Sequence, residues 1–164
     1  MRAVIILFSI IVLMAGCAFR NPRVDALKDP FNVVLLEYED IIAAIFAPLY
    51  PNLHLLTPLP DTATVVQYFL DNDFTEEIEA LRGIYQKAVD ADQNNKDQSF
   101  SAKNFRASCL RRLEERLSIF EAGLEVIQRY SYKDELVFTQ DETRKLTDFA
   151  WLRRNHMITT NRDW

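Results

Sequence analysis

Residues 101–130 read SAKNFRASCLRRLEERLSIFEAGLEVIQRY and contain the longest unbroken helical period in the chain. Apolar side chains recur there every three or four residues, a spacing that places them on one face of an α-helix. They are Phe105, Cys109, Leu113, Leu117, Phe120, Leu124 and Ile127. The charged residues between them are expected on the solvated face: Lys103, Arg106, Arg111, Arg112, Glu114, Glu115, Arg116, Glu121 and Glu125. Such a helix, roughly 40 Å long, needs partner helices along most of its length.

Helix-start signals precede this stretch. Asp29 followed by Pro30 predicts a helix with Asp as its N-cap, and Pro48 ends its apolar period. Asp61 or Thr62 caps a second helix. These signals predict at least two helices before the long one.

Two capping-box spacings predict further helix starts, one at Asp73 with Glu76 and one at Thr139 with Glu142. The polar stretch 91–99 is predicted as an exposed loop, 136–138 as a short extended piece, and the last helix as ending near residue 155. The chain shows no internal repeat and no domain boundary. It therefore predicts a single all-α domain, a mostly antiparallel bundle of four or five helices.

The N-terminus has the order of an export signal: Arg2, an apolar run over 3–14, and small residues before Cys17. Residues 13–17, LMAGC, resemble the lipobox of bacterial lipoproteins, in which the cysteine becomes the lipidated N-terminus. This resemblance implies a signal peptide over 1–16 and acylation of Cys17, which anchors the chain to membrane lipid. The residues that follow, up to residue 28, show little pattern and are predicted to form a short tether over 17–28, and the apolar period after them predicts one helical domain over 29–164.

The residue after Cys17 is Ala18. In lipoproteins of this kind a residue other than Asp at that place implies delivery to the outer membrane, so we expect a lipid anchor on its periplasmic face. An uncleaved inner-membrane signal anchor and an ordinary secretion signal remain alternatives, because the run 3–19 is only just long enough to span a bilayer.

Without residues 1–16 the chain has 148 residues, with 18 Lys and Arg against 24 Asp and Glu, a net charge of −6. This balance argues against a general affinity for nucleic acid. The basic residues of the long helix, and those at 144, 145, 153 and 154, are expected to pair with acidic helix edges, with anionic lipid headgroups as the alternative.

The sequence carries none of the common catalytic or metal-binding patterns. The chain contains no Gly-rich phosphate loop, nucleophile elbow or zinc-ligand spacing. Its two histidines, His54 and His156, follow Pro51 and Arg153 by three positions, which excludes the Glu-x-x-His pairs of di-iron bundles. A copper site using His156 and Met157 is a minor alternative. We predict no metal, no cofactor and no small-molecule substrate.

Cys109 lies on the apolar stripe of the long helix and is predicted to be a buried, inert thiol. An intermolecular disulfide and a nucleophile are the alternatives. Gly123, one turn from Phe120 and Ile127, is predicted to let another helix approach, whereas no role follows for Gly83 on a polar face.

Residues 47–60 combine four prolines with many apolar side chains. The prolines prevent a continuous helix, and the apolar side chains argue against a solvated linker. One interpretation is a lid over the end of the bundle. The other is a surface for a partner protein, with Tyr50, His54 and Leu59 as contact residues.

Taken together, the sequence favours a non-enzymatic, membrane-tethered helical lipoprotein of the bacterial cell envelope. It would bind an envelope protein as an assembly factor, a pilotin-like escort or an accessory subunit of a secretion machine. An envelope inhibitor or immunity-type protein is the second hypothesis, and an enzyme with an unrecognised site is the third.

Overall fold

The computed structural model describes residues 29–50, 59–131 and 135–152. These residues form five α-helices and one short 3-10 helix, and they contain no strand, which confirms the all-α prediction. The elements are α3 (Pro30–Phe46), η1 (Ala47–Leu49), α4 (Thr62–Asp71), α5 (Thr75–Gln93), α6 (Phe100–Tyr130) and α7 (Gln140–Trp151). None of these helices is both long enough and apolar enough to cross a bilayer.

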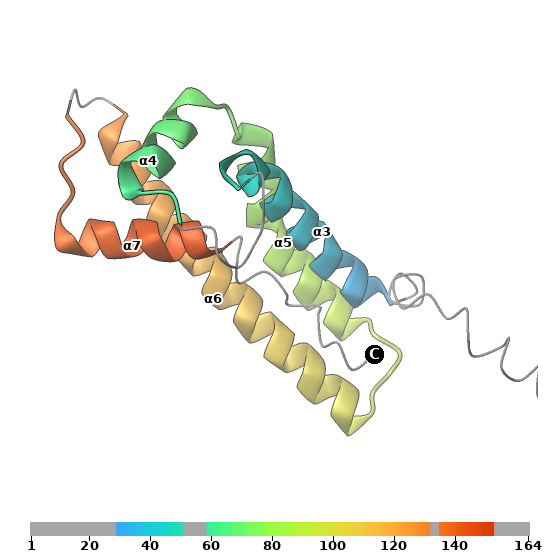
Figure 1. Ribbon diagram of the computed structural model, residues 1–164. Coiled ribbons are helices and arrows are strands. Elements are labelled where there is room, and N and C mark those ends of the chain that lie inside the picture. The colour runs from blue at the N-terminus through green and yellow to red at the C-terminus, as the bar shows by residue number, and fades with distance from the viewer. Residues whose placement is uncertain (1–28, 51–58, 132–134, 153–164) are drawn as a thin grey trace, which may run out of the picture.

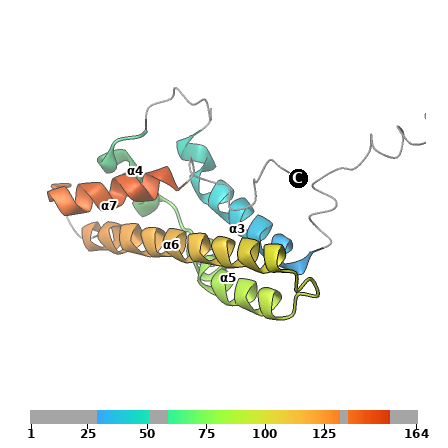
Figure 2. The same cartoon turned by 90° about the horizontal axis from the view of Figure 1, so that it is seen from below.

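The long helix α6 is the element on which the others are arranged (Figure 1). Its first half forms an antiparallel hairpin with α5, and α3 packs along α5 in the opposite direction. Its second half carries α7, which runs back along it, and α4 lies against both (Figure 2). The predicted stripe is thus covered by different helices at its two ends, as a helix of this length requires.

Three of the predicted helix starts have the expected chemistry. The Asp29 carboxylate accepts a hydrogen bond from the Phe31 N–H at 2.9 Å, and Pro30 occupies the first turn of α3. Asp61 Oδ1 accepts from the Thr64 N–H at 2.8 Å. Thr139 and Glu142 form both halves of a capping box at the start of α7. Each cap satisfies backbone donors that the first helical turn leaves unpaired.

The capping box predicted at Asp73 and Glu76 was wrong. Asp73 Oδ1 instead accepts from the backbone N–H and the hydroxyl of Thr75, at 3.0 and 2.6 Å, and α5 begins after Phe74 without a side-chain cap. The ring of Phe74 packs against Tyr68 and Phe69, with centroids 5.5 and 5.1 Å away. This aromatic contact places Phe74 at the helix start.

Two predicted boundaries also change. Helix α5 continues to Gln93, so the exposed connection is 94–99 rather than 91–99. The side chain of Asn95 in this loop donates to Asp29 Oδ1 at 2.9 Å, which ties the loop to the start of α3.

Residues 136–139 have no regular secondary structure, so the extended piece expected at 136–138 is not a strand. Helix α7 ends at Trp151, and the predicted continuation from residue 153 lies outside the described residues.

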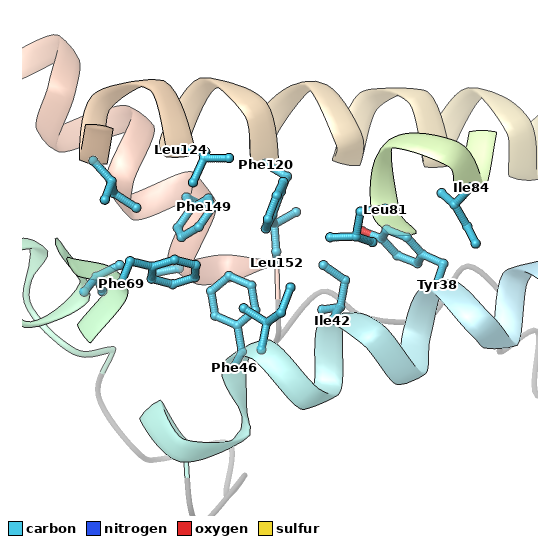
Figure 3. Close-up of a cluster of buried hydrophobic side chains, with 14 of the residues drawn as sticks. Tyr38, Ile42, Phe46, Phe69, Leu81, Ile84, Phe120, Leu124, Phe149 and Leu152 are labelled. Atoms are coloured by element: carbon cyan, nitrogen blue, oxygen red, sulfur yellow. The ribbon is translucent and has the colours of Figure 1, made fainter. Parts of the chain in front are cut away.

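Four phenylalanine rings join the helices into one core (Figure 3). Phe149 of α7 is central: its ring centroid lies 5.2 Å from Phe46, 4.9 Å from Phe69 and 5.3 Å from Phe120. These partners come from α3, α4 and α6 respectively. Aromatic contacts at such distances stabilise a core beyond the area that they bury. One side chain thus connects four helices.

Gly123 explains how α7 comes so close to α6. The glycine is buried, and a Cβ built on it would lie 2.5 Å from Phe149 Cγ and 2.6 Å from Phe149 Cβ. No side chain larger than hydrogen fits there without displacing the ring. The prediction that Gly123 admits a second helix is confirmed, and that helix is α7.

Candidate functional site

A groove of about 630 Å³ lies between α6 and the C-terminal end of α7. Its volume falls in the range of ordinary ligand pockets. The lining residues are Arg112, Glu115, Arg116 and Ile119 from α6, and Asp148, Trp151 and Leu152 from α7 and its C-cap. The α6 residues stand at positions i, i+3, i+4 and i+7, and the others at i, i+3 and i+4, so each set occupies one flank of its helix.

The groove has an apolar floor and a charged rim. Leu152 is buried, and Ile119 and Trp151 are half-buried. Arg112, Glu115 and Asp148 are exposed, which gives the rim both signs of charge. Tryptophan and arginine around an apolar centre are the side chains that dominate the energetics of protein–protein interfaces.

Arg116 reaches from the groove towards α3. Its Nη1 lies 3.9 Å from Glu39 Oε1, and the two side chains are only 16% and 14% exposed. Nη1 is buried and has no hydrogen-bond partner in the structure, and the same is true of the Tyr38 hydroxyl. Burial raises the pKa of Tyr38 to about 12, although the nearby Arg116 charge acts in the opposite direction. The Arg116 guanidinium is therefore an incompletely satisfied cation.

Cys109 is buried on α6, as predicted. Burial raises the pKa of its thiol to about 11, so the thiol stays protonated at neutral pH. The thiolate is the reactive form of cysteine. Cys109 therefore has the environment of a core residue. Within the described ranges, no group of three or more His, Cys, Asp or Glu side chains has the arrangement of a metal site.

The residues predicted to contact a partner are placed as follows. Tyr50 is 4% exposed, and its hydroxyl donates to the Ala150 carbonyl oxygen at 2.8 Å, in the last turn of α7. Leu59 is half-buried against the core. His54 lies outside the described residues. Tyr50 therefore does not present its side chain at the surface, and a partner surface on the rest of 47–60 stays a prediction.

The expectation that basic residues pair with acidic helix edges is confirmed for some of them. Arg144 Nη2 and Lys145 Nζ lie 2.8 and 2.9 Å from the two carboxylate oxygens of Asp141, which is on the same helix, α7. The expectation that Arg106 is solvated was wrong: it is 3% exposed, and its Nε donates to Asp92. The α5–α6 hairpin brings the end of one helix over the start of the next, so the guanidinium is enclosed.

The groove itself was not predicted from the sequence. Arg112, Glu115 and Arg116 were assigned to a solvated face, and Trp151 and Asp148 were not singled out. The signal available was weak, since a Trp at a helix end has many other roles. Of the predicted sites, Cys17 lies outside the described residues.

Comparison with known proteins gives no further guide. No protein-family model, curated protein or solved structure matches this chain. Its function is therefore argued from its own residues.

Proposed function

We propose that this chain is a non-enzymatic, membrane-tethered helical lipoprotein of the bacterial cell envelope that binds another protein. Its role would be that of an assembly factor, a pilotin-like escort or an accessory subunit of an envelope machine. The observation that carries the binding role is the groove between α6 and α7, where Arg112 and Arg116 lie beside an apolar floor that includes Trp151. This is the composition of a recognition surface.

The tether rests on residues 13–17 and on their resemblance to a lipobox. A diacylated cysteine gives durable attachment to a membrane, because more than one acyl chain is buried. Attachment confines the helical domain near the membrane and raises its effective concentration for partners there. For this reason the affinity of the groove for its partner need not be high.

The side chains that line the groove favour binding of a partner protein over catalysis. Its side chains are two guanidinium groups, two carboxylates, an indole and two aliphatic groups. The one thiol of the described residues, Cys109, is buried among core residues. Guanidinium and indole groups bind and orient, whereas a hydrolase or transferase of the common classes needs a nucleophile and a base within hydrogen-bond reach.

Site-specific photo-cross-linking in native membranes tests the proposal. A benzophenone amino acid replaces Glu115, on the groove rim, and separately Gln86, an exposed position on α5. We expect the full-length protein to capture one envelope protein from position 115, identified by mass spectrometry, and not from position 86.

Absence of any captured protein from positions 86, 115 and the exposed position 144 of folded variants would contradict the proposal. Capture of a toxin or a cell-wall hydrolase, with loss of its activity on binding, would move the assignment to the inhibitor class.

A further inference from the structure

The two ends of the bundle differ in their distance from the proposed lipid anchor. The start of α3, the connection 94–99 and the first turn of α6 lie at one end of the molecule, and the connection between α6 and α7 lies at the other (Figures 1 and 2). The hydrogen bond from Asn95 to Asp29 Oδ1 fixes the connection 94–99 to the residue at which the tether joins α3. We call this end, formed by residues 29–33 and 94–103, the tether end.

Phe100 exposes a large apolar side chain at the tether end. It is 81% exposed, the highest value among the large apolar residues that the structure describes. It lies five residues before Phe105, the first residue of the apolar stripe, and therefore belongs to a different face of α6. The N–H of Ser99 donates to Asp97 Oδ1 at 3.0 Å, and Ser99 Oγ accepts from the Ala102 N–H at 3.4 Å. The backbone around Phe100 is thus held in place while its ring stays outside the core.

The length of the tether decides which end of the molecule can face the membrane. Twelve peptide bonds separate Cys17 from Asp29, and a chain of that length spans at most about 40 Å. Helix α6 has 31 residues and is about 45 Å long. If α6 stood upright with its far end on the membrane, Asp29 would be about as far from the surface as α6 is long. The tether does not reach that far, so an upright domain has its tether end towards the lipid.

Charge adds little to this orientation. Lys96 and Lys103 are exposed on either side of Phe100 in the chain, and ammonium groups suit anionic headgroups. Hydrogen bonds from Ser99 lower the pKa of Asp97, so this neighbouring carboxylate is ionised and opposes them. The tether end therefore favours an apolar contact with lipid over an electrostatic one.

On the basis of the lipid tether in the proposed function, we propose that the tether end lies against the bilayer surface, with the Phe100 ring inserted among the lipid headgroups. Insertion removes the exposed ring from water, and aromatic and aliphatic side chains anchor helices at membrane interfaces in this way. Lys96 and Lys103 keep their ammonium groups at the level of the headgroups. The groove begins twelve residues further along α6, at Arg112, and stands up to about 18 Å above Phe100.

Fluorescence quenching by lipid tests the contact with the acylated full-length protein. The vesicles contain phosphatidylethanolamine, phosphatidylglycerol and a lipid with a nitroxide on its headgroup. A thiol-reactive fluorophore is attached to Asn104→Cys, an exposed position one turn after Phe100, or to Val137→Cys, which is 68% exposed at the other end. Acylation blocks Cys17, and Cys109 is buried. We expect at least threefold stronger quenching at position 104 than at position 137.

Phe100→Ser should lower the quenching at position 104 at least twofold, because it removes the inserted ring. Val137→Ser is the matched control, since it also removes an exposed apolar side chain, and it should leave the quenching at position 104 unchanged. Circular dichroism checks that both variants fold, and Phe100→Ala takes the place of a serine variant that does not. High salt should leave the quenching in place, as expected for an apolar contact.

The inference is overturned by equal quenching at positions 104 and 137, by quenching at 104 that Phe100→Ser leaves unchanged, or by its loss in high salt. A disulfide between two copies of Asn104→Cys, in place of quenching, would assign Phe100 to self-association. If these results are obtained with acylated protein that captures an envelope protein, the proposed function stands and only the membrane contact fails. A wild-type protein without lipid would overturn the tether and the membrane contact together.

Discussion

Phe149 of α7 packs directly against Gly123 on α6, with no room for a Cβ atom between them. This contact decides how closely the two helices approach. The groove begins at Ile119, one turn before Gly123 on α6, and at Asp148, the residue before Phe149 on α7. The core contact and the candidate site are therefore parts of one helix crossing, and a change in the first should alter the second.

Gly123→Ala should lower the free energy of unfolding by about 2 kcal/mol, because the new methyl group overlaps the Phe149 ring. Gly83 is the matched control, since a Cβ there meets nothing within 4 Å. Gly83→Ala should instead raise stability by about 1 kcal/mol through helix propensity. Urea denaturation followed by circular dichroism measures both. Equal effects of the two substitutions would contradict the close approach.

Tyr50→Phe should cost about 1 to 2 kcal/mol, because the Ala150 carbonyl loses its donor in a buried position. Tyr38→Phe should cost less than about 0.5 kcal/mol, because the Tyr38 hydroxyl has no hydrogen-bond partner to lose. The comparison removes one oxygen atom from a buried tyrosine in each case. Thermal melts of the two variants show which substitution lowers stability more. A larger loss for Tyr38→Phe than for Tyr50→Phe would contradict the assigned hydrogen bonding.

Stability should decline in alkali. Burial raises the pKa of Cys109 from 9.0 to about 11 and that of Tyr38 from 10.0 to about 12. Both groups bind their protons more tightly in the folded state, so their contributions are complete below pH 9 and are lost as pH rises through these values. Melting temperatures measured from pH 8 to 12 should fall, and they should fall less steeply in Tyr38→Phe. An identical slope in this variant would refute the role of Tyr38.

Arg106→Ala should destabilise the protein by about 2 kcal/mol, since it removes a buried guanidinium and leaves Asp92 without its partner. Arg112→Ala should cost less than about 1 kcal/mol, because that side chain is exposed. Both variants replace an arginine of α6 by alanine, so the change in helix propensity is the same in the two. Denaturant midpoints of the two variants test the assignment of Arg106 to the protein interior.

Metabolic labelling with a fatty-acid analogue tests the lipid anchor. The wild type and Cys109→Ala should carry the label, and Cys17→Ala should not, because acylation requires the thiol that follows the signal peptide. Label on Cys17→Ala would place the lipid elsewhere, and an unlabelled wild type would leave the chain without the proposed tether.

The helices and their starts could be predicted from the sequence because the forces that set them are local. Asp29, Asp61 and Thr139 bond to backbone groups two or three residues away, and these partners are fixed once the next turn forms. The apolar stripe of α6 is equally local, since its period follows from helix geometry. The failure at Asp73 has a tertiary cause, the packing of Phe74 on α4.

The groove, the burial of Arg106 and the position of Tyr50 were decided by tertiary structure alone. Tyr50 bonds to a residue one hundred positions later, and no local pattern encodes that distance. Gly123 indicated that a helix comes close, but only the fold shows that it is α7. The flanks of α6 and α7 form a groove because two helices cross at that glycine, and a crossing depends on the packing of all the core side chains at once.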